Sequence, residues 1–205
     1  MSDICLTTAY LAPVSYFQSV VQSDQIFLEQ YESYQKQSYR NRCIIATSNG
    51  KLALTIPIEK QSNQKLLIRD VLVSNHTEWQ LLHWRAIESA YNSTPFFEFY
   101  KDDLISYYQK KWKYLWDFNF EIQLKIFELL EIQPKIELTS QFNLNLDENV
   151  LDLRNCIHPK NDIKLNDVPK YYQVFDLKNG FISNLSIIDM LFNMGNESQL
   201  LLNNK

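Results

Sequence analysis

The spacing of apolar residues changes partway along the chain, and this change limits the fold more than any other feature of the sequence. Up to about residue 74, apart from one short helical stretch, apolar residues fall into brief, often alternating runs typical of β-strands. From residue 77 they recur every three or four positions, as in amphipathic helices. We therefore expect an α/β fold: a mixed sheet, built from N-terminal strands and a C-terminal strand, packed by central helices.

Six segments have the composition of strands, and two of them are joined by a clear turn signal. Asn49-Gly50 separates segments 43–47 and 51–58, and this dipeptide readily adopts positive φ in the tight turn of a hairpin. The predicted strands are 4–11, 25–31, 43–47, 51–58, 66–74 and 171–175.

Five segments are predicted to be helical. The first is 13–22, with Pro13 in its first turn. Thr77 and Gln80 have the spacing of a capping box at the start of the second, and Thr94-Pro95 opens the third. Asp117 or Asn119 is expected to cap a fourth helix that ends at Leu130, and the last runs from a cap at Asn184 to Gly195. The second helix carries an apolar stripe made of Trp79, Leu82, His83, Ala86, Ile87, Ala90 and Tyr91.

The length of the chain and its composition favour one domain. A chain of 205 residues, 45% of them hydrophobic, is long enough for a single core, so we expect one domain over 1–205. Segment 139–167 is dominated by Asn, Asp and Leu and is predicted to be a poorly ordered insertion.

Glycine, histidine and cysteine usage limits the chemistry. With glycine only at 50, 180 and 195, neither common phosphate-cradling loop motif can be written. The three histidines, at 76, 83 and 158, share no metal-ligand spacing, so no metal is expected. The cysteines at 5, 43 and 156 indicate reduced thiols. The sequence points to no particular cofactor.

Charge and hydropathy define the expected surroundings of the chain. No stretch approaches the roughly 20 apolar residues of a membrane span, and no signal peptide is evident, so we expect a cytoplasmic protein. The formal net charge of -4 argues against a nucleic-acid partner. A small anionic ligand remains compatible with it.

One basic segment, residues 33–58, contains Lys36, Arg40, Arg42 and Lys51 and no Asp or Glu. Guanidinium and ammonium groups gathered in this way suit a phosphate or carboxylate ligand, with Gln35 and Asn41 orienting its polar groups. The other interpretation is a strand edge whose cations pair with acidic residues elsewhere in the fold.

Two further residues each have a structural and a functional interpretation. His83 lies on the apolar stripe, so it is either a hydrogen-bonded core residue or a general acid or base facing a pocket. Asp189 borders the buried stripe of the last helix and is either paired structurally, for example with an arginine of the basic segment, or a site acid. Cys43 with His83 could form a thiolate and its base, although a buried Cys is the commoner case.

Four stretches together resemble the WbqC-like family of bacterial proteins, and they span most of the chain. They are the run 34–43; Tyr10-Leu11-Ala12-Pro13 with Tyr16-Phe17 and Asp24; Trp79, His83-Trp84, Ile87, Tyr91 and Pro95-Phe96-Phe97 with Tyr100; and the run 184–193. Two departures stand out. Many relatives have a His-Gln pair where this chain has Thr7-Thr8-Ala9, and a Gly-containing segment replaces the Asn-rich stretch.

The resemblance implies a role in surface-polysaccharide or O-antigen (lipopolysaccharide) biosynthesis, as an enzyme acting on a sugar intermediate. Our hypothesis is a transferase that moves an acyl or aminoacyl group to an activated amino sugar. Lys36, Arg40 and Arg42 would bind its phosphates or a donor carboxylate, and His83 would move a proton. The remaining candidate substrate-binding residues are Gln35, Asn41, Tyr10, Tyr91 and Asp189.

The alternative is a non-catalytic module that binds a nucleotide-sugar, or a scaffold that binds enzymes of the same pathway. An enzyme should bring Gln35, Arg42 and His83 together in one cleft, whereas a scaffold should leave them scattered.

Overall fold

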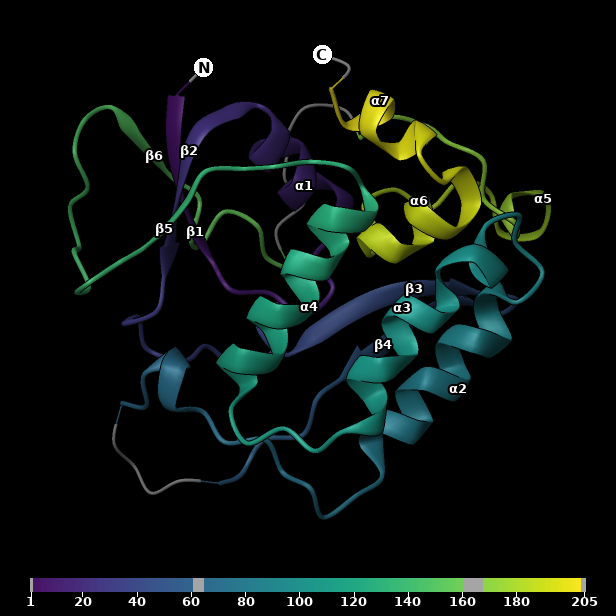
Figure 1. The fold of residues 1–205 in the computed structure, drawn as a ribbon, viewed down its shortest axis with the longest axis horizontal. Coiled ribbons are helices and arrows are strands. Elements are labelled where there is room, and N and C mark those ends of the chain that lie inside the picture. The colour runs from purple at the N-terminus through teal and green to yellow at the C-terminus, as the bar shows by residue number, and fades with distance from the viewer. Residues whose placement is uncertain (1, 61–64, 161–167, 204–205) are drawn as a thin grey trace.

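The computed structural model describes residues 2–60, 65–160 and 168–203 (Figure 1). In chain order the elements are β1 (Ser2–Thr7), α1 (Val14–Val21), β2 (Ser23–Glu29), β3 (Arg42–Thr47), β4 (Gly50–Thr55), the 3-10 turn η1 (Ile68–Asp70), α2 (Trp79–Tyr91), α3 (Phe97–Gln109), α4 (Leu115–Leu129), β5 (Ile136–Leu138), β6 (Val150–Asp152), α5 (Asp176–Asn179), α6 (Ile187–Met194) and α7 (Glu197–Asn203).

A four-stranded sheet with the order β5-β2-β1-β6 organises the N-terminal part, and all its paired strands are parallel. The crossover from β1 to β2 runs through α1, whose buried side chains pack beside the sheet. Because side chains alternate along a strand, Ile4 and Leu6 share a buried face with Ile26 and Leu28. The expected α/β class is confirmed.

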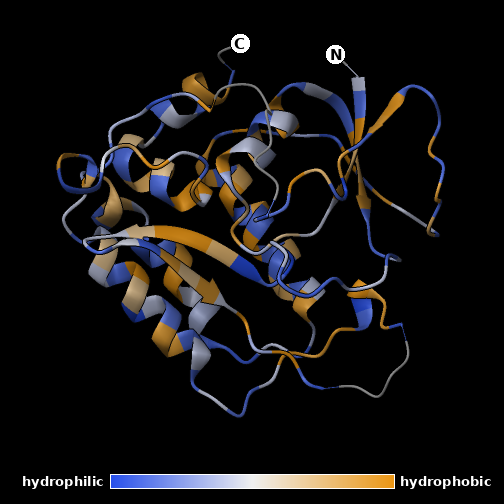
Figure 2. Cartoon of the chain, turned by 180° about the vertical axis from the view of Figure 1, so that it is seen from behind, coloured by the Kyte–Doolittle hydropathy of each residue, from blue (hydrophilic) through white to orange (hydrophobic). Residues whose placement is uncertain are grey.

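A separate antiparallel hairpin is formed by β3 and β4, as the Asn49-Gly50 signal predicted. Thr47 pairs with Gly50, whose φ of 99° lies in the region that glycine adopts without a steric penalty. Figure 2 shows that most of β3 is hydrophobic, beginning at a hydrophilic end. Cys43 and Leu54, which face each other across the hairpin, are buried in the core.

Helices α2, α3 and α4 supply most of the aromatic core, and the predicted helical stripe is largely confirmed. Trp79, His83, Ile87 and Tyr91 are buried as expected. Leu82 was wrongly placed on the stripe, since it is 60% exposed.

The predicted side-chain caps of these helices do not form. Glu78, and not Thr77, occupies the N-cap position of α2, without a side-chain hydrogen bond. The fourth predicted helix, α4, begins at Leu115, before either proposed cap. Asn119 lies within α4, where its Nδ2 donates to the carbonyl oxygen of Arg40 over 2.7 Å.

Two predicted strands are absent from the described residues. Segment 66–74 contains η1 and isolated bridges to three different segments, so it has no single partner along which a ladder could extend. Segment 171–175 is a loop in which Gln173 bonds the backbone of Ile182 through both its amide oxygen and its amide nitrogen. The short strands β5 and β6 occupy the edges of the parallel sheet instead.

The last predicted helix corresponds to α6, which ends at Gly195 as expected. Its N-cap position is Ser186, so the cap expected at Asn184 is wrong. Asn184 instead adopts φ of 56°, and its Oδ1 accepts a hydrogen bond from the backbone N–H of Ser15 in the first turn of α1. It therefore supplies an acceptor to a different helix from the one predicted.

Segment 139–167, expected to have little order, is described only up to residue 160. That part includes β6 and the buried side chain of Arg154, which is 3% exposed. Residues 161–167 lie outside the described ranges.

Candidate functional site at the carboxyl edge of the parallel sheet

The carboxyl ends of the four parallel strands meet at one edge of the sheet. Strand β1 ends at Thr7, β2 at Glu29 and β6 at Asp152, and the loops 30–41 and 153–160 follow β2 and β6 directly. In open α/β sheets, ligands bind outside this edge. The predicted basic segment begins in the first of these loops, so topology alone places it where a ligand would be expected.

Arg40 is deeply buried at this edge and is paired with an acid. Its Nε donates to Oε1 of Glu32 over 2.7 Å, and its Nη2 donates to Oε2 over 2.5 Å. The two residues are 1% and 4% exposed, and the hydroxyl of Thr7 also donates to Glu32. A bidentate pair of this kind fixes the orientation of both side chains. The Arg40–Glu32 pair is thereby joined to the end of β1 through the hydroxyl of Thr7.

Arg154 forms a second cluster of charges, in which Arg154 and Glu29 are buried and Asp152 is exposed, and which the sequence had not suggested. Its Nη1 contacts Glu29 at 3.2 Å, and its Nη2 and Nε bond the two carboxylate oxygens of Asp152 at 2.7 and 2.9 Å. The hydrogen bond from Arg154 holds the pKa of Asp152 below its usual value. The sequence did hold one signal for Arg154. It is an arginine just after a short run of alternating apolar residues, in a segment otherwise poor in cations.

Two contacts join the loops above the sheet edge. Nε2 of Gln35 donates to Oδ1 of Asn155 over 2.6 Å, and Nη2 of Arg40 donates to the carbonyl oxygen of Arg154 over 3.2 Å. The loop after β2 and the loop after β6 therefore form one continuous surface, which we call the carboxyl-edge site.

The other polar residues of the basic segment differ in their surroundings. Lys36 is exposed, and Nε of Arg42 donates to the hydroxyl of Thr55 across the hairpin at 3.2 Å. Asn41 donates to the carbonyl of Ile56, while its buried Oδ1 has no hydrogen-bond partner among the described residues. Burial raises the pKa of Tyr34 to about 12, although the positive charges of Arg40 and Arg42 oppose the shift. Tyr34 thus lies within the field of both guanidinium groups.

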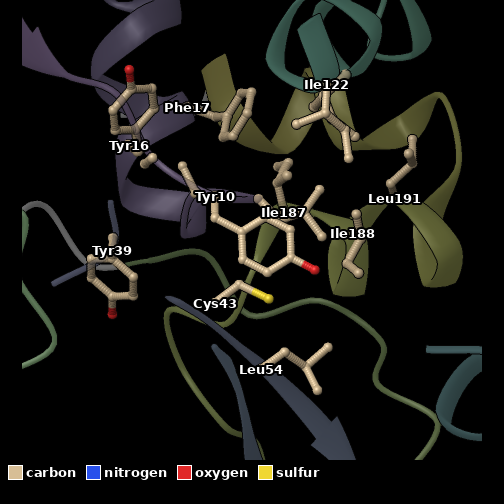
Figure 3. Close-up of a cluster of buried hydrophobic side chains, with 14 of the residues drawn as sticks. Tyr10, Tyr16, Phe17, Tyr39, Cys43, Leu54, Ile122, Ile187, Ile188 and Leu191 are labelled. Carbon is tan, nitrogen blue, oxygen red and sulfur yellow. The ribbon is translucent and has the colours of Figure 1, made fainter. Parts of the chain in front are cut away.

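His83 belongs to a buried polar group in the core. Its Nδ1 lies 2.9 Å from the hydroxyl of Tyr10, which lies 2.9 Å from the hydroxyl of Tyr108. Figure 3 shows Tyr10 between the α6 residues Ile187 and Ile188 and the hairpin residue Cys43. Burial lowers the pKa of His83 to about 4, against a smaller opposing effect of a hydrogen bond with the backbone of Thr55. The imidazole is therefore neutral at pH 7.

The depressed pKa of His83 predicts a specific acid sensitivity. In the unfolded chain its pKa returns to about 6.5, so between pH 6.5 and 4 the unfolded state binds more protons than the folded state. The neutral His83 side chain therefore contributes to the stability of the folded state above pH 6.5. At most roughly 3 kcal/mol of stability is lost as pH falls from 6.5 to 4. We expect His83→Gln to lose less stability than wild type between pH 7 and 4 in urea titrations. Equal losses in the two proteins would contradict the prediction.

Asp189 is paired with tyrosines and not with an arginine of the basic segment. Tyr171 donates to its Oδ1 and Tyr91 to its Oδ2, each over 2.8 Å, and Tyr91 accepts in turn from the backbone N–H of Ala46. Burial raises the pKa of Asp189 to about 6, although these hydrogen bonds oppose the rise. The group links α2, β3 and α6 in the core.

The candidate residues fall into three groups. Gln35, Lys36 and Arg40 belong to the carboxyl-edge site. Arg42 bonds the side chain of Thr55, His83 bonds its backbone, and Tyr10 contacts His83, while Asn41 bonds the neighbouring Ile56. Tyr91 and Asp189 form the third group. Sequence reasoning missed Glu29, Glu32, Tyr108, Asp152 and Arg154.

Two other places in the core are candidates for a reactive centre, the thiol of Cys43 and a small apolar gap between the helices, and neither has the properties of one. Burial raises the pKa of the Cys43 thiol well above its usual value, and Tyr10 is its side-chain hydrogen-bond partner. The gap is lined by Leu11, Trp84, Ile87, Leu104, Tyr108, Ile122 and Ile188. Across residues 2–60, 65–160 and 168–203, no three His, Cys, Asp or Glu side chains gather in a way that could hold a metal ion.

The fold and the candidate site together define the class of protein. It is an α/β protein with a polar site of mixed charge at the carboxyl edge of a parallel sheet. Residues 8–163 match the WbqC-like protein family, and the chain belongs to that family. It is also similar to the Uncharacterized protein Rv1507c of Mycobacterium tuberculosis (strain ATCC 25618 / H37Rv), with 31% identity over 88 residues. That match covers 43% of this chain and 38% of the relative, so the matched part is well under half the relative's length.

No solved structure is significantly similar to the chain. Within the part of the chain that the structure describes, no helix combines the length and the apolar character needed to cross a membrane.

Proposed function

We propose that the chain binds a small phosphorylated sugar intermediate, such as a nucleotide-sugar, at the carboxyl-edge site, and that it acts in bacterial surface-polysaccharide or O-antigen biosynthesis. The proposal rests on one observation: the loops after β2 and β6 are joined by the Gln35–Asn155 and Arg40–Arg154 hydrogen bonds. The joined loops lie outside the carboxyl ends of the parallel strands. Membership in the WbqC-like family and the resemblance of the basic segment to its signature support the pathway assignment.

The residues of the basic segment would have different roles in ligand binding. Lys36, from the carboxyl-edge site, and Arg42, from the adjoining start of β3, are at least partly accessible and would contact phosphate or carboxylate oxygens. Gln35 would orient polar groups of the sugar. Asn41, which we had expected to do the same, is buried and bonds Ile56, so its role would be to position the start of β3. Arg40, which we had expected to contact the ligand, already uses Nε and Nη2 for Glu32 and Arg154. Its role would be to position the loop.

The reaction we favour is transfer of an acyl or aminoacyl group to the amino group of an activated amino sugar. The amine nitrogen forms an amide bond to the acyl carbon while the bond from that carbon to the donor's leaving group breaks, and the leaving group departs with the bonding electron pair. The amine loses a proton, which a neutral imidazole can accept. His83 is neutral at pH 7 and is connected through Thr55 to Arg42. The alternative, a non-catalytic nucleotide-sugar-binding or scaffold protein, is supported by the separation of Gln35 from His83, because Gln35 pairs with Asn155 and not with the Thr55 group.

Arg42→Ala is the direct test of anion binding. A lost charge-assisted contact should weaken nucleotide-sugar binding by about 1.5 to 3 kcal/mol, or roughly 10- to 150-fold, with the melting temperature nearly unchanged. Isothermal titration calorimetry measures the change. Arg85→Ala, which removes an exposed cation from α2, is the matched control and should bind as wild type does. Unchanged affinity in Arg42→Ala would remove Arg42 from the site.

A further inference from the structure

His158 is brought to the carboxyl-edge site by the loop after β6, although nothing in its sequence context indicates a ligand role. The residues just before it in this loop are anchored. Leu153 and Ile157 are 5% and 4% exposed, and Arg154 and Asn155 form the two contacts to the loop after β2. His158 itself remains partly exposed. It therefore directly follows the anchored part of the loop and is partly accessible.

The hydrogen bonding of His158 determines which ring nitrogen can donate. The backbone N–H of Lys160 donates to Nδ1 of His158 over 3.1 Å, so Nδ1 acts as the acceptor. In a neutral imidazole the proton then resides on Nε2. Among the described residues, Nε2–H has no partner and is the group left to bond an oxygen of a ligand.

The charges around His158 favour an anion. Burial is the main cause that lowers its pKa, and the positive charges of Arg40, from the loop after β2, and Lys160, from its own loop, lower it further. The acids at this edge are each paired with an arginine, since Glu32 pairs with Arg40, and Glu29 and Asp152 pair with Arg154. A bound phosphate would add the negative charge that stabilises an imidazolium ion.

We propose that His158 is a ligand-binding residue of the carboxyl-edge site, which donates from Nε2 to a phosphoryl oxygen and takes up a proton as the ligand binds. This inference rests on the proposed function and adds to it a second anion-binding element, supplied by the loop after β6. Because proton uptake is linked to binding, affinity for a phosphate ligand should increase as pH falls from about 8 to 6.

Calorimetry with inorganic pyrophosphate tests this role. Wild-type protein is titrated at pH 7 in two buffers of different ionisation enthalpy, and the difference in binding heat reports the protons taken up. We expect His158→Gln to bind about 5- to 20-fold more weakly and to lose both the proton uptake and the increase in affinity at low pH. His76→Gln, which changes another exposed histidine, is the matched control and should retain all three properties.

The outcomes separate this inference from the proposal on which it rests. Pyrophosphate binding that weakens in Arg42→Ala but keeps its affinity and proton uptake in His158→Gln would overturn the role of His158 alone. No binding to the wild-type protein, or binding that neither variant changes, would overturn both. A melting temperature measured for each variant shows that a loss of binding does not reflect unfolding.

Discussion

Arg40→Met is expected to destabilise the protein by about 3 to 5 kcal/mol, because it leaves the Glu32 carboxylate buried without its cation. Glu32 is 4% exposed and receives both hydrogen bonds of the Arg40 fork. The same change also removes the bond from Arg40 to the carbonyl of Arg154, which joins the two loops. Denaturation in urea, followed by circular dichroism, measures the loss.

Two further variants make the Arg40 result specific. Arg85→Met removes an exposed cation from α2, so the free energy of unfolding should change by less than about 0.5 kcal/mol. Arg40→Met combined with Glu32→Gln should recover part of the loss, since the buried charge is gone. If Arg40→Met costs less than about 1 kcal/mol, the pair does not hold the edge of the sheet together.

His83→Gln is expected to lower the rate of group transfer about 10²- to 10⁴-fold, with ligand affinity nearly preserved. Glutamine can still hydrogen-bond Tyr10, but it cannot accept a proton as the imidazole can. The comparison requires the rate per folded molecule, because any side-chain change in this buried group also affects stability. The assay should use an activated amino sugar and an acyl or aminoacyl donor.

Tyr108→Phe is the control for the His83 variant. It removes a hydroxyl from the same hydrogen-bonded group and leaves the imidazole in place. We expect it to reduce stability modestly and to retain most of the turnover. A His83→Gln protein that is less stable yet turns over at the wild-type rate would mean that His83 is a core residue. Nucleotide-sugar binding without turnover in wild type would favour the non-catalytic alternative.

Local patterns in the sequence were sufficient for several elements because their causes are local. The Asn49-Gly50 turn depends on the backbone freedom of adjacent residues, and it produced the β3–β4 hairpin as predicted. The stripe that begins at Trp79 depends only on helical spacing. The predicted strands at 66–74 and 171–175 failed because a strand requires a neighbour, and the composition of a segment does not say whether one is present.

The sequence by itself determined the α/β class and the position of a cluster of cations after the second strand. Only the tertiary structure decided which cations are free to meet a ligand. Arg40 and Arg42 are two residues apart, yet one is buried against Glu32 and the other bonds Thr55 on the hairpin. Likewise, His158 approaches Arg40 only because β6 lies beside β1 and parallel to it. The environment of a charge depends on the strands and loops packed around it, and these come from distant parts of the chain.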